Sequence, residues 1–572
     1  MTAGLLTWGC VWYWLTLLVL LAGGCTSMAA ASFLDAAALN DSSMHVGIMC
    51  IPLYGHWKPL WAIGEAFTRR GHHVTYFSEE PRWCEEIVRY GGDRAACIDM
   101  PSRGVFRDAA FFEKLSRADS VFLTFADLWN ESFRHHELQL GGYLAAAQRV
   151  HARRPLSVLL SDAATFVGGS VARALDVPSV LFFPLTTMLP LGFFNRLPLM
   201  GTGWPAQMSS WQRLQNFLLR GMLVGLADSL HRVNDGRALY KIPPLRNGYE
   251  LGGWYDTVLA PTIWGFDIPQ ELCPNFHPLG LLSFDEDRTP FMEKELAAFL
   301  RRCPQGAVYV NFGTLVSLHR RQADRLASAL RQLPYCVVWK LTDAQRERLC
   351  QGELGEMEGR THLRPYFASS LKIMKHAKVV AFVSHCGDRS VHEALESQLP
   401  IVGIPFFADQ SDVCQRLQEA GVGRCVGHKD RFTSDAVSGA IQWVVQNADQ
   451  AKANMRRLLQ VSRFLGGAER AVDIIESRYH NHLLGRNESL ERCAVFNDES
   501  GVEAQPLRIE QLDVFLVWII AFVSLWLIVF ACTAKLSSRL AQAMRPKQAS
   551  LAKRGPRFTV SPRATQPEKK AE

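Results

Sequence analysis

The chain has 572 residues, 48% of them hydrophobic and 20% charged, which is enough for about two globular domains with additional segments. Its net charge of +7 arises in the C-terminal tail, where ten basic residues follow Ala534 and only Glu568 and Glu572 oppose them. The rest of the chain has no basic excess, and this argues against nucleic-acid binding.

The N-terminus carries an apolar run from Gly9 to Gly23, followed by small residues. This order is typical of a secretory signal peptide, which is removed from the mature protein. The residues before the run include no Lys or Arg, so an uncleaved membrane anchor is the alternative. We expect residues 1–30 to be a signal peptide.

The next segment has a strand, helix, strand pattern. The apolar run His45–Pro52 predicts a first strand, and Val74–Phe77 predicts a second. Between them, Leu60–Arg70 has the apolar spacing of a helix, which Gly71 ends. His56 falls in the predicted loop between the first strand and this helix. Ligands of open α/β sheets bind at this carboxyl edge of the strands.

A carboxylate is predicted at the same edge. Leu156–Asp162 reads as a buried strand that ends in Asp162, and the small-residue helix Gly168–Leu175 follows it. For His56 alone, a structural loop histidine is as good an interpretation as a catalytic base. A carboxylate on a neighbouring strand end favours the base, because a general base needs an orienting partner and a pKa near neutrality.

The chain then becomes strongly apolar. Leu181–Trp204 is rich in Phe, and Trp211–Leu219 has an amphipathic pattern. Core packing explains both, and a wall for a lipophilic acceptor or a surface dipping into the membrane interface is the alternative. The proline-containing segment Pro261–Leu282 is predicted to link two domains.

The second half begins with the predicted strand and loop Ala307–Thr314. The backbone N–H after Gly313 and the hydroxyl of Thr314 can bind a diphosphate, although a plain tight turn is the alternative. Further on, Val379–Val383 is an apolar run rich in β-branched residues, which predicts a buried parallel strand.

A glycine-bearing turn and a helix follow that strand. The helix is predicted over Ser390–Ser397, and Ile401–Ile404 predicts the next strand. This βαβ order is typical of a nucleotide-binding domain. The turn places His385 and Gly387 at the helix N-terminus, where free N–H groups and the helix dipole favour a phosphate.

The C-terminal part predicts a membrane anchor. Lys452–Arg478 is expected to form helices that return across the two domains, and 481–513 reads as a polar stalk. Residues 514–534 are apolar, uncharged and long enough to cross a bilayer, unlike most buried core helices. The positive-inside rule assigns the basic tail, 535–572, to the cytosol.

Several weaker sequence features are consistent with globular domains in the lumen. Sequons occur at Asn40, Asn130 and Asn487, each weak by itself. The dilysine Lys569-Lys570 resembles a retrieval signal of endoplasmic-reticulum membrane proteins, with chance in a Lys-rich tail as the alternative. The fourteen cysteines form no CxxC pair, so no zinc site is expected. An oxidising lumen permits disulfides, but the sequence does not fix their pairing.

The segment from Phe367 to Gln410 resembles the 44-residue signature of the UDP-glycosyltransferase family. An aromatic residue begins the segment, Asp409 and Gln410 end it, and the intervening His, Gly, Ser and Glu fall at the family's positions. The alternative is an ordinary Rossmann domain that binds another nucleotide or none. Phe367 replaces the family's Trp, Ser370 its Gln and Arg389 its Asn. These departures bear on the base and the sugar of the donor.

The resemblance implies an α/β protein of the GT-B fold, with two Rossmann-like domains facing a cleft. Residues 45–282 would bind the acceptor and residues 283–480 the UDP-sugar. Phe367 would stack on uracil, Glu393 would bind the ribose, and Asp409 would hold sugar hydroxyls. The full donor-binding set implied by the resemblance is Gly313, Thr314, Phe367, Ser370, His385, Gly387, Arg389, Ser390, Glu393, Asp409 and Gln410.

The resemblance also implies a reaction. His56 would deprotonate an acceptor hydroxyl with Asp162 orienting its ring, and a hexosyl group, glucose or glucuronate, would move to a small lipophilic acceptor with inversion. The UDP-sugar is a co-substrate, and no cofactor or metal is expected. A membrane glycolipid transferase, for sterols or sphingolipids, is the first alternative. A catalytically degenerate UDP-sugar-binding scaffold is the second. The implied location is the endoplasmic-reticulum membrane, with one C-terminal span, lumenal domains and an open question of homo-oligomers.

Overall fold

The structure is a computed structural model that describes residues 43–102, 104–118, 121–184, 197–226, 230–245, 255–269, 275–282, 292–349, 359–484 and 512–543. The predicted signal peptide, the sequons at Asn40 and Asn487, nearly all of the predicted stalk and the tail after residue 543 lie outside these residues. Residues 185–196, half of the apolar segment Leu181–Trp204 for which an acceptor wall is the alternative, lie outside them as well.

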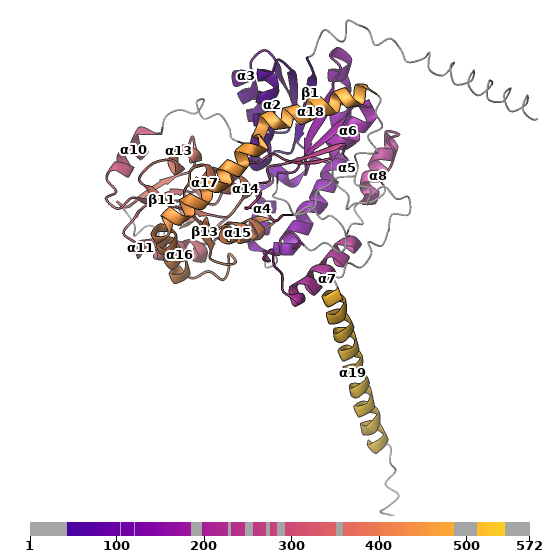
Figure 1. The fold of residues 1–572 in the computed structure, drawn as a ribbon, viewed down its shortest axis with the longest axis vertical. Coiled ribbons are helices and arrows are strands. Elements are labelled where there is room, and N and C mark those ends of the chain that lie inside the picture. Colours follow the sequence, from indigo (N-terminus) through magenta and orange to yellow (C-terminus); the bar gives the residue numbers. More distant parts are fainter. Residues whose placement is uncertain are drawn as a thin grey trace, which may run out of the picture. The chain divides into compact units, whose positions relative to one another are not determined.

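The N-terminal half is built on a parallel sheet of seven strands in the order β3-β2-β1-β4-β5-β6-β7 (Figure 1). The strands are β1 His45–Cys50, β2 His73–Ser78, β3 Ala95–Asp99, β4 Val158–Asp162, β5 Ser179–Phe182, β6 Thr257–Ala260 and β7 Phe276–Pro278. Its helices are α2 Tyr54–Arg69, α3 Pro81–Tyr90, α4 Ala109–Arg117, α5 Val121–Arg153, α6 Val167–Leu175, α7 Ser210–Leu226 and α8 Leu230–Leu239, with the 3-10 turn η1 Val105–Arg107.

The C-terminal half contains a second parallel sheet, of six strands in the order β10-β9-β8-β11-β12-β13. These are β8 Ala307–Asn311, β9 Cys336–Lys340, β10 Thr361–Arg364, β11 Val379–Ser384, β12 Ile401–Gly403 and β13 Gly423–Cys425. The helices are α10 Lys294–Arg301, α11 Arg320–Arg331, α12 Asp343–Leu349, α13 Ser370–Met374, α14 Asp388–Glu396, α15 Gln410–Glu419, α16 Ser434–Gln446, α17 Ala448–Leu465 and α18 Gly467–Leu483.

The composition of the central strands explains both sheets. β1, β4 and β8 are buried at every residue, because helices cover both faces of each sheet. Strands of this kind do not alternate between polar and apolar residues, and they were predicted from continuous runs of Val, Ile and Leu. The crossover helices leave the carboxyl ends of the strands open at one edge of each sheet.

Two expectations from the sequence are wrong in detail. The helix after β1 begins at Tyr54 and runs through Pro59, so His56 lies in its first turn and not in a loop. The prediction began the helix at Leu60, where the helical apolar spacing starts. The predicted linker Pro261–Leu282 also contains β7, which pairs with β6 and completes the first sheet.

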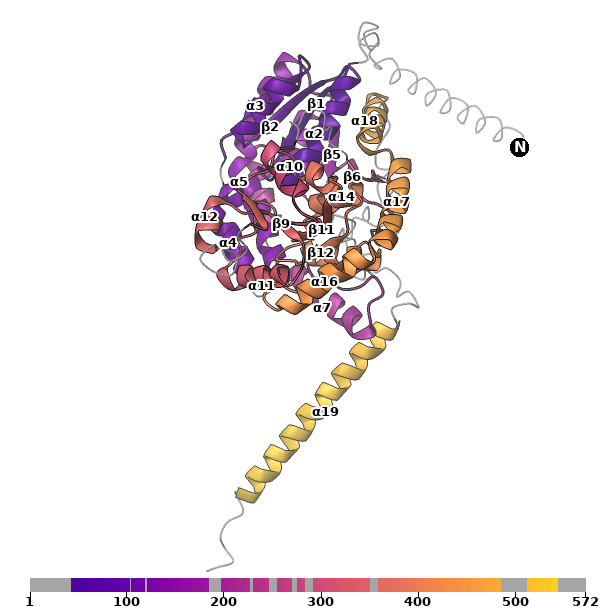
Figure 2. The same cartoon turned by 90° about the vertical axis from the view of Figure 1, so that its left-hand side faces the viewer.

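The last two helices of this body run back across the two halves, as expected. α17 contacts α14 of the C-terminal half, and α18 contacts α2 (Figures 1 and 2). Val472 and Ile475 of α18 are fully buried in the same cluster as Trp57 and Phe67 of α2. The N-terminal core is therefore completed by residues from the far end of the body.

α19, Leu512–Ala543, belongs to a separate compact unit and is described by itself. It contains an 18-residue apolar window, Phe522–Arg539, none of which is buried. By length and composition this helix is a candidate membrane span, in agreement with the prediction. It starts before the predicted span and carries the first basic residues of the tail in the same helix.

Candidate active site

His56 is positioned by a rigid first turn of α2. Leu53 is extended, and its carbonyl accepts the N–H groups of His56 and Trp57, both at 3.0 Å. Trp57 is fully buried and stacks on Trp83 with 4.6 Å between ring centroids. Because the next residue is anchored in the core, the side chain of His56 has little freedom, and 21% of it remains exposed.

Asp162 holds the imidazole of His56. Its Oδ1 is hydrogen-bonded to Nδ1 of His56, and its Oδ2 accepts the hydroxyl of Thr165. The N–H of Ala164 also donates to Oδ1, at 3.2 Å. The carboxyl lies at the carboxyl end of β4, fully buried, next to the end of β1. Thr165 and the N–H of Ala164 hold the carboxylate, and the carboxylate fixes the ring through Nδ1 and leaves Nε2 as its proton-accepting atom.

The charges of the pair are set by burial and by each other. Burial lowers the pKa of His56, but Asp162 and then Asp409 outweigh it, and the net pKa is raised above 6.5. Burial raises the pKa of Asp162, but His56 and Thr165 more than reverse this, and the carboxyl stays ionised. The negative charge of Asp409, in the C-terminal half, therefore contributes to the raised pKa of the base.

The turn before α14 is shaped around His385. Gly387 is the N-cap of α14, and a Cβ added there would lie 2.5 Å from Nε2 of His385. Gly313, at φ 73°, faces the same ring, and a Cβ added to it would lie 2.9 Å from Cε1. Burial and then Lys340 lower the pKa of His385 to about 4, so the imidazole is neutral. Gly313 and Gly387 therefore form a clamp around the neutral imidazole of His385 at a helix N-terminus, where the ring can donate a hydrogen bond.

Asn311 supports this region, and the sequence prediction missed it. Its Oδ1 accepts the N–H of Gly313 at 2.9 Å, and its Nδ2 donates to the hydroxyl of Tyr309 at 2.9 Å. Its only sequence signal was a polar residue at the end of a buried strand. Thr314, in the same loop, is exposed, as a residue that contacts a ligand needs to be.

The side chains of Phe367 and Ser370 both contact Tyr309 of β8. Phe367 is only 5% exposed and meets the ring of Tyr309 edge to face, with 6.1 Å between centroids. The hydroxyl of Ser370 is hydrogen-bonded to that of Tyr309 at 3.0 Å. Their predicted contacts with the base stay predictions, and both side chains have other partners in this structure.

Arg389 joins the predicted ribose-binding glutamate to the chain between the two halves. Its Nε donates to Oε1 of Glu393 at 3.1 Å, and one terminal nitrogen donates to the carbonyl of Leu282 at 2.8 Å. Burial raises the pKa of Glu393, while Arg389 opposes the shift. Ser390, in the first turn of α14, is partly exposed.

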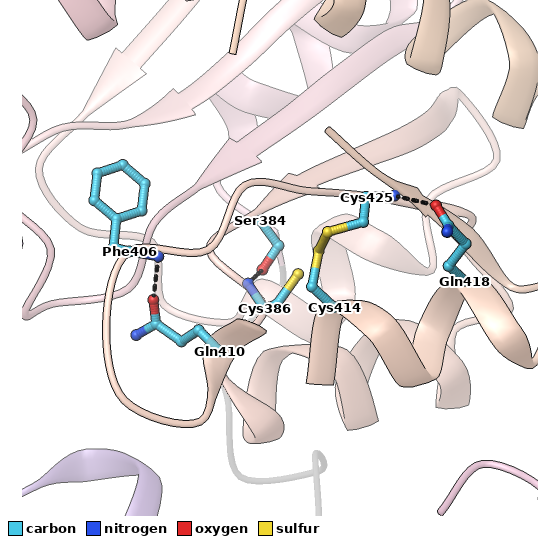
Figure 3. The surroundings of a disulfide bond; sticks show 7 residues. All are labelled: Ser384, Cys386, Phe406, Gln410, Cys414, Gln418 and Cys425. Atoms are coloured by element: carbon cyan, nitrogen blue, oxygen red, sulfur yellow. Dashed lines mark hydrogen bonds between the residues drawn. A yellow bond between two sulfur atoms is a disulfide. The ribbon is translucent and has the colours of Figure 1, made fainter. Parts of the chain in front are cut away.

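Asp409 and Gln410 close the motif where α15 begins. Oε1 of Gln410 accepts the N–H group of Phe406 at 2.9 Å (Figure 3) and that of Phe407 at 3.2 Å. The N–H of Ala408 donates to the hydroxyl of Thr124 in α5 at 3.2 Å. Burial raises the pKa of Asp409 to about 6.

The described residues form three disulfides, Cys84–Cys97, Cys303–Cys336 and Cys414–Cys425. The third joins α15 to β13 beside the donor motif, next to the buried free Cys386 (Figure 3). Gly403 permits this arrangement, because a Cβ there would lie 2.4 Å from Sγ of both Cys386 and Cys414. Three disulfides favour an oxidising compartment.

Asn130, the asparagine of the second sequon, is exposed on α5.

Comparisons with known proteins identify the family of the chain. Residues 150–472 match the family described as UDP-glucoronosyl and UDP-glucosyl transferase. UDP-glucuronosyltransferase 2A1 of Mus musculus is 27% identical over 54% of this chain and 58% of its own length. UDP-glucuronosyltransferase 1A1 of Rattus norvegicus is 24% identical over 73% of this chain and 79% of its own. The chain thus spans little more than half of the mouse relative.

Solved structures show the fold. Phytolacca americana UGT2, complexed with UDP-2fluoro-glucose and pterostilbene, has a TM-score of 0.53 and 18% identity, over 77% of this chain and all of that one. A UDP-glucosyltransferase from Polygonum tinctorium has a TM-score of 0.55 and 18% identity, over 77% and 99%. The fold and the site define a glycosyltransferase architecture of the GT-B type. Within it, the chain belongs to the UDP-glucuronosyl and UDP-glucosyl transferase family.

Proposed function

We propose that the protein transfers a hexosyl group, glucose or glucuronate, from a UDP-sugar to a hydroxyl of a small lipophilic acceptor. The observation that carries this proposal is the His56–Asp162 pair, set in one half and electrostatically coupled to Asp409 of the other. The family and its named relatives support the donor class, because they are glucuronosyl and glucosyl transferases. The solved Phytolacca structure of the same fold, complexed with UDP-2fluoro-glucose and pterostilbene, is consistent with this donor class.

In the proposed reaction, Nε2 of His56 takes the proton of the acceptor hydroxyl. The acceptor oxygen attacks the anomeric carbon from the face opposite UDP, and the bond between that carbon and the phosphate oxygen breaks. UDP leaves with the bonding electrons, and the configuration inverts. Asp162 stabilises the imidazolium, as the carboxylate does in a catalytic triad. The N–H groups at the start of α14 stabilise the charge that develops on the leaving diphosphate.

The proposed location is the endoplasmic-reticulum membrane with both halves in the lumen. The disulfides support an oxidising compartment, and α19 supports a membrane span. No metal or additional cofactor enters the proposed steps, because the proton acceptor and the leaving-group contacts all come from the chain.

The test is UDP release by the full-length protein in detergent, with UDP-glucose and UDP-glucuronate offered alongside phenols, sterols and ceramides. His56→Ala should lower acceptor-dependent release by about 10³-fold, the order expected when a general base is lost. The variant should still bind UDP in a calorimeter. His73→Ala, at the amino end of β2 and so at the opposite edge of the sheet, is the matched control and should behave as wild type. Full activity in His56→Ala would refute the proposed mechanism.

A further inference from the structure

A pocket of about 330 Å³ opens on the N-terminal half, where α5 contacts both α6 and α8 (Figure 1). It is lined by residues of α5, by the last turn of α6 and by the segment that follows α8. α6 begins near Asp162 at the carboxyl edge of the first sheet and runs back along it, so its last turn lies at the opposite edge from His56. The pocket is therefore separate from the candidate active site, and its volume suits a small molecule.

The lining of the pocket combines positive charge with apolar surface. Of the described residues that line it, Arg173 and Lys241 are cationic and none is acidic. Leu144 and Ile242, each 5% exposed, supply the apolar part. An inorganic anion would use only the charges, and an uncharged apolar molecule would use only the apolar surface. A ligand that carries an acidic group on an apolar body would use both.

A third cation, Arg237 of α8, lies behind the wall of the pocket. It is 5% exposed, and its guanidinium donates to the carbonyl of Pro243 at 2.7 Å and to the hydroxyl of Ser170 in α6 at 2.8 Å. Both partners are neutral, and no carboxylate of the described residues pairs with it. Burial and the charge of Arg173 lower the pKa of Arg237 to about 10, so it stays charged at neutral pH. A buried cation is costly unless a negative charge compensates it.

Arg237 also fixes the segment that carries Lys241. Its carbonyl accepts the N–H groups of Tyr240 at 3.1 Å and Ile242 at 3.0 Å, and these bonds end α8. Lys241 lies between them with φ 57°, in the left-handed region that glycine usually occupies after a helix. The hydroxyl of Tyr240 reaches α5 because Gly141 has no side chain, since a Cβ there would lie 2.2 Å from it. The turn thus places a charged side chain in the pocket lining at a position where glycine would be less strained.

The carboxyl ends of α6 and α8 also favour basic residues, because the helix dipole is negative there. Each helix end carries only about half an elementary charge. Two such ends do not balance the charges of Arg173, Arg237 and Lys241, so the positive charge around the pocket is not explained by the helices alone.

We propose that this pocket binds a small amphipathic organic anion. Its acidic group lies between Arg173 and Lys241, and its apolar body lies against Leu144 and Ile242. The negative charge of the ligand compensates Arg237 behind the wall. The proposal does not depend on the transfer reaction, because the pocket uses none of the donor-binding residues and lies away from His56.

The experiment measures the binding of 2-naphthoate to the full-length protein in detergent by calorimetry. 2-Naphthamide has the same rings without the charge, and inorganic phosphate has charge without an apolar body. 2-Naphthoate should bind about tenfold more tightly than either of them, since a charge-assisted hydrogen bond and the burial of an apolar body are each worth at least this factor. Arg173→Ala and Lys241→Ala should each weaken 2-naphthoate by about tenfold and leave the unfolding temperature unchanged, because both side chains are exposed.

The controls separate this pocket from other places where an acid could bind. Arg301→Ala removes an exposed arginine of α10 in the other half and should bind 2-naphthoate as wild type does. His56→Ala should also keep the wild-type affinity, and a loss there would assign the acid to the acceptor site and overturn the inference. Equal binding of 2-naphthamide or phosphate overturns it too, as does wild-type affinity in both Arg173→Ala and Lys241→Ala or no binding to the wild-type protein. None of these outcomes bears on UDP release, which tests the proposed function separately.

Discussion

At the scale of single residues, Asp162 acts on His56 in two ways. It fixes the ring through Nδ1, and its charge stabilises the protonated form. Thr165 and the N–H of Ala164 hold the carboxylate in turn. The effect of Asp162 on the orientation of the ring can be separated from the effect of its charge, because an Asn side chain has the shape of the carboxylate without its charge.

Asp162→Asn should lower kcat by about 10³- to 10⁴-fold, as the loss of the triad carboxylate does elsewhere. The wild-type rate should fall as the pH falls through the raised pKa of His56, above 6.5, because only the neutral imidazole accepts a proton. The substitution removes the main cause that raises this pKa, so the acidic limb of the kcat/KM profile should move to lower pH. An unchanged limb would show that His56 does not set it.

Gly387→Ala tests the clamp on His385. The added methyl would meet Nε2 at 2.5 Å, so either the imidazole or the start of α14 has to shift. UDP binding should weaken by about tenfold or more, since the phosphate contacts depend on this turn. Gly439→Ala, in α16 with open space around its Cβ, is the matched control and should leave UDP binding unchanged. Equal affinities of the two variants would argue against the clamp.

The sequence predicted the residues that sit at the ends of strands, and the reason is geometric. Asp162 ends β4 and His56 follows the end of β1, the neighbouring parallel strand, so their proximity follows once both strands are identified. The surroundings of Phe367 could not be predicted in this way. Its burial depends on Tyr309, which lies on another strand and carries no motif.

At the scale of elements, α15 connects the donor motif to the N-terminal half. Gln410 begins the helix, and in the same first turn the carboxylate of Asp412 accepts the N–H of Gly201 at 2.5 Å and of Gly203 at 2.7 Å. Arg416 donates to the carbonyl of Trp204 at 2.7 Å. The loop around Gly201 is therefore hydrogen-bonded to α15, the helix that begins at the predicted sugar ligand Gln410.

Asp412→Ala should reduce the free energy of unfolding by about 2 kcal/mol, because two N–H groups lose a buried acceptor. Part of the loss is offset, since burial raises the pKa of Asp412 to about 7 and the charged form is itself costly to bury. Urea denaturation of the full-length protein measures the change. The exposed Asp93→Ala is the control, with an expected change within about 0.5 kcal/mol. A similar small effect for Asp412→Ala would mean that the loop is held by other contacts.

The elements that sequence analysis misjudged share a cause. α2 starts earlier than predicted because Leu53 and the buried Trp57 set its first turn, ahead of the apolar spacing that begins at Leu60. β7 has only three residues, too few to produce a readable period in a proline-containing segment. In both places, contacts with the rest of the sheet decide the outcome.

At the scale of the whole molecule, both parallel sheets could be predicted, because each has strands made of continuous apolar residues. The strand order could not, since it depends on which crossovers pack together. The two halves are held by contacts from several elements. Lys429, which is fully buried, donates to the carbonyls of Leu115 and Ser116 at the end of α4. Arg70 pairs with Glu469 and Asp473 of α18 on the surface, where each pair adds little.

The return of α18 to α2 has a consequence for synthesis. Domains generally fold as units while the chain leaves the ribosome, the N-terminal one first. Here the first hydrophobic core waits for Val472 and Ile475, which are translated after the entire second sheet. The growing chain therefore exposes an unfinished apolar surface along α2 through most of its elongation. A ribosome that stalls before α18 would release a first half that cannot close, and chaperone demand should fall sharply once that helix has emerged.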